Sequence, residues 1–373
     1  MKAAHFARRL ARVHEAMALA GVDALLLSLG ADMPWVTGYV AMPLERLTML
    51  VVPAAGQGVP TLVVPELEAP RVSPVPGVFA LQPWGETEDP TAIVTSLVSK
   101  CAGGSPLLAV SDRAWATFVL RLQATLPGAR WRPASEVTAR LRAVKDEAEV
   151  EALAEASAAA DRVAEALLGG QIALVGRTER EVSVEITYRL LAEGHEKVNF
   201  AIVASGPNSA SPHHEPGERR IAEDEPVVCD FGGTLGGYCS DITRTVFTGH
   251  PTPELARIYE VVAEAQASGV MSAQVGELCC GVDDAARRVI TEAGYGEYFV
   301  HRTGHGIGLE EHEDPYIVAG NSEPLTAGHA FSVEPGVYLP GRYGVRIEDI
   351  VVATSRGPRS LNAADHSLTV VDA

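Results

Sequence analysis

The second half of the chain contains the same order of elements twice. A long Ala- and Glu-rich helix is expected over residues 147–168, and a second helix ends at Gly194. A helix expected over residues 253–270 and another that ends at Gly294 repeat this order, and strand-like sequence follows each pair. Repeated units of this kind bury their apolar faces by packing against each other. The pattern therefore predicts a duplicated half-domain, and a site between the halves would take side chains from both.

Residues 1–144 predict a separate α/β domain. Apolar runs typical of strands alternate with helix-like stretches, and residues 145–373 begin with the long helix described above. We expect helices over 1–20, 91–101 and 113–126, a further helix capped by Ser135, and strands over 23–28, 47–52, 61–64 and 107–110. Asp32 and Arg46 lie between these segments and are interpreted as solvated loop charges.

The charge balance excludes some classes of partner. The 373 residues include 30 basic and 48 acidic side chains, which gives a net charge of −18. This field disfavours nucleic acid and anionic membranes as partners. No apolar run approaches the roughly 20 residues of a membrane span, and no signal peptide is recognised. The five cysteines show no C-x-x-C spacing, which predicts free thiols and a cytoplasmic protein.

Five residues of the metal-ligand type occur in the last third of the chain: Asp230, Asp241, His305, Glu334 and Glu348. Asp230 ends the strand-like run 226–229, and the glycines that follow permit a tight return to Asp241. A hairpin would set these two carboxylates side by side. They would then repel each other unless a cation lay between them.

The other three residues lie in the second repeat. His305 stands between two glycines, where bare backbone permits a close approach. Glu334 and Glu348 each end an apolar run, and strand alternation places Arg346 on the same face as Glu348. Four carboxylates and one imidazole are a usual ligand set for a pair of divalent cations. Two such ions can activate water and hold the bond that it attacks, so the sequence predicts a hydrolytic site.

These segments resemble the pita-bread metallopeptidases, the family of methionine aminopeptidase, aminopeptidase P and Xaa-Pro dipeptidase (prolidase). The likeness spans roughly residues 147–362, and residues 1–144 resemble the smaller domain of aminopeptidase P and prolidase. The resemblance implies an α/β (creatinase-N-like) N-terminal domain and an α+β pita-bread (creatinase/aminopeptidase) catalytic domain with duplicated half-domains. It also implies that Asp230 binds one metal ion, that Asp241 and Glu348 bridge two, that His305 binds the other, and that Glu334 completes the set.

The resemblance further implies roles around the metal ions. His213 and His312 match histidines that face the substrate and its tetrahedral intermediate, while His214 is a neighbour of the pocket only. Glu334 would act as the general base, with His213 and His312 stabilising the oxyanion. The expected substrate-binding residues are His213, His301, His312, Arg346, Tyr238 and Arg46.

One departure from the family pattern concerns the substrate carboxylate. Some prolidases have an arginine shortly after the position of His312, placed to hold that carboxylate. Here the run 312–316 reads HEDPY and contains no arginine. Arg346, or Arg46 of a partner subunit, would then have to supply the positive charge.

We therefore expect a cytoplasmic enzyme that hydrolyses Xaa-Pro dipeptides. Aminopeptidase P, which releases the N-terminal residue from longer Xaa-Pro peptides, is the alternative, and a non-catalytic pita-bread binding module is a third reading. Two divalent ions are expected, with Mn²⁺ first and Co²⁺, Fe²⁺ or Zn²⁺ as alternatives. The resemblance also implies a homodimer.

Overall fold

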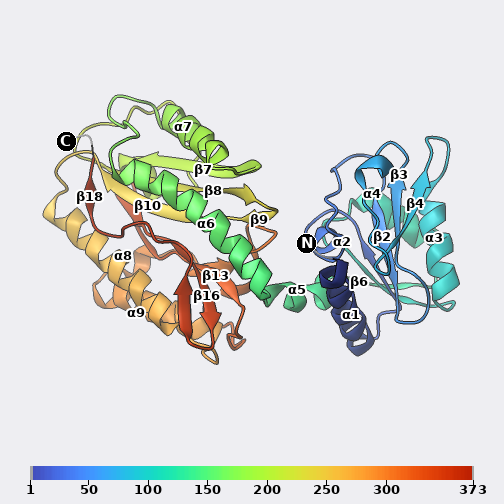
Figure 1. Ribbon diagram of the computed structural model, residues 1–373. Coiled ribbons are helices and arrows are strands. Elements are labelled where there is room, and N and C mark those ends of the chain that lie inside the picture. The colour runs from blue at the N-terminus through green and yellow to red at the C-terminus, as the bar shows by residue number, and fades with distance from the viewer. Residues whose placement is uncertain (1–2, 372–373) are drawn as a thin grey trace. The chain divides into compact units, whose positions relative to one another are not determined.

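The computed structural model describes residues 3–371 and divides into two compact units. The division falls between Arg142 and Ala143, whereas the sequence predicted it after residue 144. Each unit contains its own sheets and its own apolar core, so each is described by itself (Figure 1).

The first unit is built on one six-stranded sheet in the order β4-β3-β2-β1-β5-β6. Strand β1 pairs antiparallel with β2 and parallel with β5, and its four residues are fully buried. The strands are β1 Ala24–Leu27, β2 Met49–Pro53, β3 Thr61–Pro65, β4 Ala80–Trp84, β5 Leu107–Val110 and β6 Arg130–Pro133. The helices are α1 Ala3–Ala20, α2 Asp32–Thr37, α3 Pro90–Cys101, α4 Ala116–Thr125 and α5 Ser135–Ala143.

The interpretation of Asp32 as a solvated loop charge is wrong. Asp32 begins helix α2, and Arg142 Nη1 donates to its Oδ1 at 2.9 Å. Both side chains are largely buried, and a buried carboxylate is tolerated when a cation pairs with it. Arg46 is more exposed, and it forms an ion pair with Glu86 at 3.0 Å.

The second unit contains two five-stranded sheets, each accompanied by two helices, and one two-stranded sheet. The first sheet has the order β18-β10-β8-β7, with β9 paired to β8, and the second has the order β12-β11-β13-β16-β17. The first set of elements is α6 Glu147–Leu168, α7 Glu179–Ala192, β7 Lys197–Ser205, β8 Pro226–Leu235, β9 Tyr238–Cys239 and β10 Ile242–Phe247. The second is α8 Pro253–Ser272, α9 Cys279–Glu292, β11 Gly304–Gly306, β12 Glu313–Ile317, β13 Ala330–Val333, β16 Asp349–Thr354 and β17 Gly357–Ser360. Strands β14 Gly336–Leu339 and β15 Tyr343–Arg346 form a separate hairpin, and β18 is Thr369–Val370.

The duplication predicted from the sequence is confirmed. Helices α6 and α7 lie against the β7-β8-β10 sheet, and α8 and α9 pack against each other beside the second sheet (Figure 1). Reciprocal capping boxes at Asp146 and Thr178 start α6 and α7, because each cap and the Glu three residues later satisfy backbone N–H groups. Apolar side chains of α6, α7 and β8, such as Val163, Ile186 and Phe231, form one core cluster.

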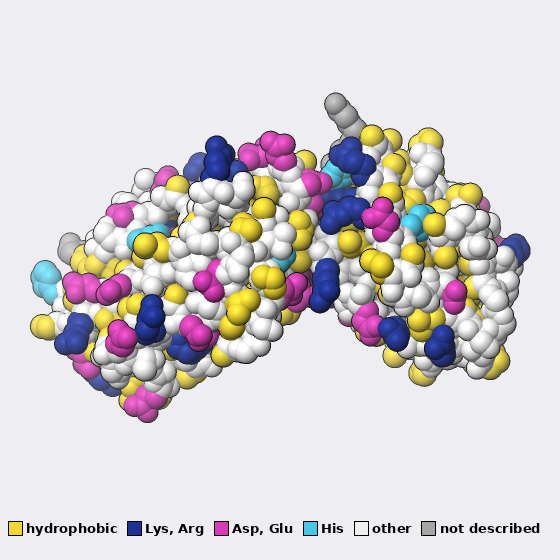
Figure 2. All heavy atoms as spheres, turned by 90° about the horizontal axis from the view of Figure 1, so that it is seen from below, with side chains coloured by type: hydrophobic (Ala, Val, Ile, Leu, Met, Phe, Trp, Pro, Cys, Tyr) yellow, Lys and Arg dark blue, Asp and Glu magenta, His cyan; other side chains and the backbone are white. Residues whose placement is uncertain are grey.

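On the face drawn in Figure 2, acidic and basic side chains are interspersed over both units. Within residues 3–371, no helix is long and apolar enough to cross a membrane. All five cysteines are free thiols.

Candidate active site

The predicted hairpin places Asp230 beside Asp241. Asp230 lies within β8, and in the antiparallel register of β8 and β10 it stands opposite Thr243. Asp241 comes directly before β10 and so faces the same region from the neighbouring strand. Both carboxylates are buried and line one pocket with a volume of about 520 Å³. Gly236 and Gly237 make the tight return with positive φ, whereas Gly232 and Gly233 lie within β8, where a Cβ atom would collide with Ser240 O or Lys197 O.

His305 reaches this pocket from the short strand β11, which is confined between β12 and β13. A Cβ atom at Gly304 would lie 1.8 Å from Ser332 O, and one at Gly306 would lie 2.2 Å from Asp314 O. Only glycine fits on either side of His305, because the neighbouring strands approach so closely. The two glycines thus allow the strand that carries His305 to fit between β12 and β13.

The orientation of His305 suits a ligand nitrogen. Its Nδ1 lies 3.2 Å from Gly306 O and donates to it, which leaves the Nε2 lone pair free. Nε2 lies 3.4 Å from Glu334 Oε1 and 3.8 Å from Asp241 Oδ2. Burial, followed by the effect of His312, lowers the pKa of His305 to about 3. The imidazole is therefore neutral at physiological pH, the form that binds metal ions.

Glu334 and Glu348 complete the acidic cluster. Glu334 follows β13 and accepts a hydrogen bond from Ser332 Oγ at 3.2 Å. Glu348 lies between β15 and β16 and accepts from Thr243 Oγ1 at 2.6 Å. Burial raises the pKa of Glu334 to about 7. Burial and then the neighbouring carboxylates raise the pKa values of Asp241 and Glu348 well above their usual range.

This cluster fits divalent cations. Asp241, His305 and Glu348 each offer a ligand atom, and these atoms lie within 4.8 Å of one another. Asp230 Oδ1 and Asp241 Oδ1 are buried and have no hydrogen-bond partner among the described residues. Buried carboxylate oxygens without a donor are costly unless a cation or a proton compensates them. Carboxylate oxygens with one neutral imidazole are the ligands of borderline divalent ions.

Arg346 lines the same pocket, and every nitrogen of its guanidinium is already in contact with the protein. Nη2 lies 2.5 Å from Asp230 Oδ2, and Nε donates to Thr243 Oγ1 at 3.2 Å. Nη1 donates to Tyr338 Oη at 2.8 Å and to Pro212 O at 3.4 Å. Only 3 % of the residue is exposed. These contacts involve all three nitrogens and tie the guanidinium to Asp230 and its neighbours.

Tyr238, expected to bind substrate, is not among the residues that line this pocket; Tyr338 does not line it either, but it contacts two residues that do, Arg346 and His301. Tyr238 lies in an apolar cluster under α6, where its hydroxyl donates to Glu149 Oε1 at 2.9 Å. It is absent from the lining of the pocket. Tyr338 is the neighbour of Arg346, and its hydroxyl lies 2.8 Å from His301 Nε2. Because the residue lies on the β14 strand of the separate hairpin, no motif around the ligands pointed to it.

Hydrogen bonds determine which ring nitrogen of His301 carries the proton. Tyr338 Oη accepts from Arg346 and therefore donates to His301 Nε2, while His301 Nδ1 donates to Arg302 O at 2.7 Å. Burial, followed by the positive charge of Arg346, lowers the pKa of His301 to about 4. His301 is thus a neutral member of a chain of hydrogen bonds at the edge of the pocket.

His213 and His312 both line the pocket and are exposed to solvent. The ring of His312 lies 3.9 Å from the ring of His305, measured between centroids. Burial of part of the ring, followed by the charge of Arg302, lowers the pKa of His312. Both histidines can therefore offer an N–H group to a ligand bound next to His305.

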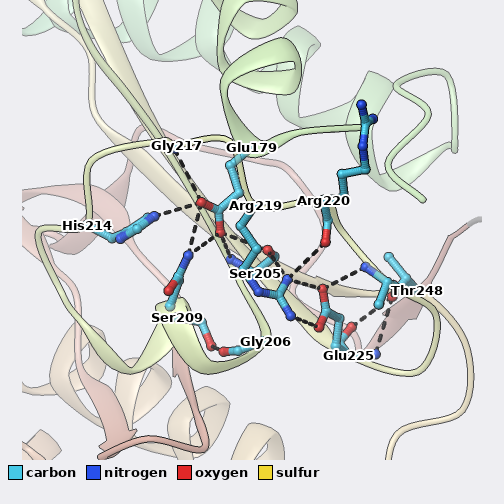
Figure 3. A network of polar contacts seen from close by, with 12 residues as sticks. Glu179, Ser205, Gly206, Ser209, His214, Gly217, Arg219, Arg220, Glu225 and Thr248 are labelled. Atoms are coloured by element: carbon cyan, nitrogen blue, oxygen red, sulfur yellow. Dashed lines mark hydrogen bonds and ion pairs between the residues drawn. The ribbon is translucent and has the colours of Figure 1, made fainter. Parts of the chain in front are cut away.

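His214 belongs to a polar network centred on Glu179 (Figure 3). His214 Nε2 lies 2.8 Å from Glu179 Oε2, and the fully buried Glu179 also accepts from Ser205 and Asn208. Arg219 connects the same network to Glu225 through two contacts of 2.6 Å. The network anchors both ends of the segment that carries His213.

The pocket also contains residues that no motif indicated. They are Phe200 and Ile202 on β7, and Pro212, Arg302 and Glu311 in loops. The two apolar side chains come from strand β7, to which the sequence analysis assigned no role at the site. Arg46 belongs to the first unit and is not part of this lining.

Comparison with known proteins gives a consistent result. Residues 151–355 match the model of metallopeptidase family M24, and residues 9–144 match that of the creatinase/prolidase N-terminal domain. The chain is 44 % identical over 371 residues to a probable dipeptidase, PepE, of Mycobacterium tuberculosis, covering 98 % of this chain and 96 % of that protein. The crystal structure of dipeptidase PepE from Mycobacterium ulcerans matches with 43 % identity and a TM-score of 0.90, covering 100 % of this chain and 99 % of the other. A recombinant prolidase from Thermococcus sibiricus matches with 35 % identity and a TM-score of 0.92, covering 99 % of each chain.

Proposed function

This chain belongs to metallopeptidase family M24, and we propose that it hydrolyses the peptide bond before proline in Xaa-Pro dipeptides by means of two bound divalent metal ions. The observation that carries the proposal is the convergence of Asp230, Asp241, His305, Glu334 and Glu348 on one pocket. Among these side chains are two buried carboxylate oxygens that have no hydrogen-bond partner within residues 3–371. A cluster of this charge is hard to explain without cations.

The five residues would hold the ions between them. Asp241 and Glu348 are central, because their atoms lie with His305 within 4.8 Å. When bound, divalent ions lower the pKa of a coordinated water towards about 7 and polarise the carbonyl oxygen of the substrate. One carboxylate oxygen of Asp230 contacts Arg346, and the other has no hydrogen-bond partner among the described residues, so it could bind a metal ion.

Glu334 is the proposed general base. A carboxyl group with a pKa near 7 can both accept and return a proton at neutral pH. Glu334 would take the proton of the attacking water and deliver it to the proline nitrogen, which lacks an N–H group in the peptide bond and must gain a proton to leave. His213 and His312 would donate N–H groups to the oxygen of the attacked carbonyl.

The similar proteins support a small substrate. Two of them are named dipeptidase, and a third is named prolidase. Aminopeptidase P activity on longer peptides is the alternative, since it would use the same ligands and base. A non-catalytic binding module is the third possibility, and the complete set of five ligand-type residues argues against it.

The proposal also includes Mn²⁺ as the native metal, a homodimer as the assembly and the cytoplasm as the location. Carboxylate-rich ligand sets favour Mn²⁺, Co²⁺ or Fe²⁺. Metal analysis of protein purified without added metal tests the first point. Sedimentation of the full chain tests the second.

Hydrolysis of four matched peptides tests the substrate assignment. Ala-Pro, Ala-Pro-Ala, Ala-Ala and Pro-Ala are compared at equal concentration with Mn²⁺ and after chelation. The proposal predicts rapid cleavage of Ala-Pro, which chelation abolishes and Mn²⁺ restores. Cleavage of Ala-Pro-Ala at an equal or higher rate would favour aminopeptidase P, and equal rates for Ala-Ala would remove the proline specificity.

A further inference from the structure

We infer that Arg302 binds the free carboxylate of the substrate and thereby selects dipeptides over longer peptides. The inference rests on the proposed function and adds to it a residue that determines specificity. It starts from the charges that line the pocket, which are five carboxylates and two guanidinium groups, those of Arg302 and Arg346.

The two arginines are in different situations. Arg346 is buried, and its three guanidinium nitrogens contact Asp230, Thr243, Tyr338 and Pro212. Arg302 is only partly buried. Within residues 3–371, no carboxylate lies within ion-pair distance of its guanidinium and no side-chain or backbone oxygen accepts from it. Arg302 is therefore the pocket-lining cation that is free to bind an anion.

Arg302 is nevertheless held in a definite place. It follows His301 and comes two residues before strand β11. Its guanidinium carbon lies 4.5 Å from the centre of the Tyr316 ring on the neighbouring strand β12. An aromatic face supports a guanidinium through cation–π attraction and leaves its planar N–H groups available. Stacking on Tyr316 thus orients the guanidinium of Arg302 and leaves its N–H groups available for hydrogen bonds.

The run that follows His312 explains why the contact between Arg302 and Tyr316 matters. It contains no arginine, so no cation there can meet a substrate carboxylate. Tyr316 ends that run, and it is the residue on which Arg302 rests. Arg302, in the loop before β11, thus supplies the positive charge that the run after His312 lacks.

A substrate carboxylate needs such a cation in this pocket. Asp230, Asp241, Glu311, Glu334 and Glu348 all line it, and an unpaired carboxylate would be repelled by them. A planar guanidinium can bind both oxygens of a carboxylate at once. In a tripeptide, the carbonyl of the second residue is neutral and gains no such ion pair. Arg302 would therefore favour substrates whose second residue is also the last.

The test compares a dipeptide with its own amide. The ratio of kcat/KM for Ala-Pro to that for Ala-Pro amide is measured for the wild type, Arg302→Met and Arg302→Lys, all loaded with Mn²⁺. We expect the wild type to prefer the free acid by about 10- to 100-fold, the value of a charged hydrogen-bonded pair. Arg302→Met should lose most of this preference through KM for Ala-Pro, and Arg302→Lys should keep part of it.

Control variants separate this role from general damage. Arg359→Met changes an exposed arginine that pairs with Glu151 and is not among the pocket-lining residues, and it should retain the wild-type ratio. Arg46→Ala tests the other arginine named from the sequence. A ratio that falls in Arg46→Ala and not in Arg302→Met would overturn the inference.

Two further outcomes are decisive. If the Arg302 variants do not fold, the wild type alone remains informative, because equal kcat/KM for the acid and the amide would contradict a carboxylate site. If the wild type cleaves no Xaa-Pro substrate, the proposed function fails first. Cleavage of Ala-Pro with no effect of Arg302 on the ratio would overturn the inference and leave the proposed function standing.

Discussion

Arg346 Nη2 and Asp230 Oδ2 lie 2.5 Å apart, and both residues line a pocket that is also lined by four other carboxylates. This ion pair neutralises one carboxylate of the candidate metal site before any cation arrives. Arg346 also contacts Tyr338 and Pro212, so the same guanidinium connects the ligands to the segment before His213. Removal of Arg346 would thus affect both stability and metal binding.

We predict that Arg346→Leu destabilises the metal-free protein by about 3 kcal/mol, because loss of one partner leaves a buried charge uncompensated. Urea unfolding after chelation measures this change. Arg346→Lys keeps the charge but not the planar fork, and it should recover part of the loss. A loss below about 0.5 kcal/mol in the leucine variant, the size of an exposed pair, would show that the ion pair is unimportant.

Glu334 gives a prediction about pH. Its folded pKa of about 7 lies above its ordinary value of 4.5. The folded metal-free protein therefore binds a proton that the unfolded chain releases, and this carboxyl group reduces stability as pH rises from about 4.5 to 7. Several buried histidines have the opposite effect on the total stability, so the useful quantity is the difference between Glu334→Gln and the wild type.

Chelated Glu334→Gln should be more stable than the chelated wild type at pH 8 by about 2–3 kcal/mol, and the two should converge near pH 5. Thermal unfolding of both proteins between pH 5 and 8 measures the difference. Ser332→Ala removes a donor to the same carboxylate and should increase the effect. A difference that does not depend on pH would show that Glu334 keeps its ordinary pKa.

Glu179 gives a prediction about the His213 segment. Burial alone would raise its pKa, but hydrogen bonds from Ser205, His214 and Asn208 outweigh burial and leave the pKa below its usual value. Glu179→Gln would replace one carboxylate oxygen, which accepts hydrogen bonds, by an NH₂ group. That group would face the donors of Ser205, Asn208 and His214. We expect a loss of about 2 kcal/mol in stability and a decrease in kcat/KM, because a loosened segment no longer holds His213.

The control for Glu179 is Glu185→Gln on the same helix, α7. Glu185 pairs with Arg177 and Arg189 outside the network under the His213 segment. It should lose stability without a comparable loss of kcat/KM. Equal losses of activity in the two variants would show that Glu179 acts through general stability alone.

Metal affinity gives a prediction about the central carboxylates. Asp241→Asn removes the charge of a residue whose Oδ1 has no hydrogen-bond partner in the part of the chain that the structure describes, and the side chain remains nearly the same size. We expect bound Mn²⁺ to decrease and the Ala-Pro activity to fall by at least a factor of 1,000, because the ligand set no longer compensates the ions. The exposed Glu218→Gln is the control, since Glu218 forms its ion pair with Arg180 on the surface, away from the pocket-lining residues. Full metal content in Asp241→Asn would contradict its role.

The sequence allowed the frame of this fold to be predicted where local signals were strong. Helix α6 was predicted with its observed bounds, because a capping residue precedes it and its apolar pattern is long. Helix α2 and strands β4 and β6 were missed, because they are short and β4 and β6 are edge strands with exposed side chains. The predicted fold class and family were confirmed. They could be predicted because the glycines and the acidic residues at strand ends form recognisable segments.

The remaining features of the site depend on tertiary contacts. Tyr338 and Tyr238 both follow glycine-containing segments, and only the β14–β15 pairing places Tyr338 beside Arg346. Arg302 and Tyr316 meet because β11 and β12 are antiparallel neighbours. No pattern in the sequence predicted that these two strands pair. The metal-ligand assignments and the role of Arg46 stay predictions.

Metal titration of the chelated enzyme tests the central claim most directly. Metal-free protein is titrated with Mn²⁺ while bound metal and Ala-Pro hydrolysis are measured on the same samples. The account predicts no hydrolysis without metal and full activity when two ions are bound per chain. Hydrolysis by demonstrably metal-free protein, or full activity with a single bound ion, would contradict it.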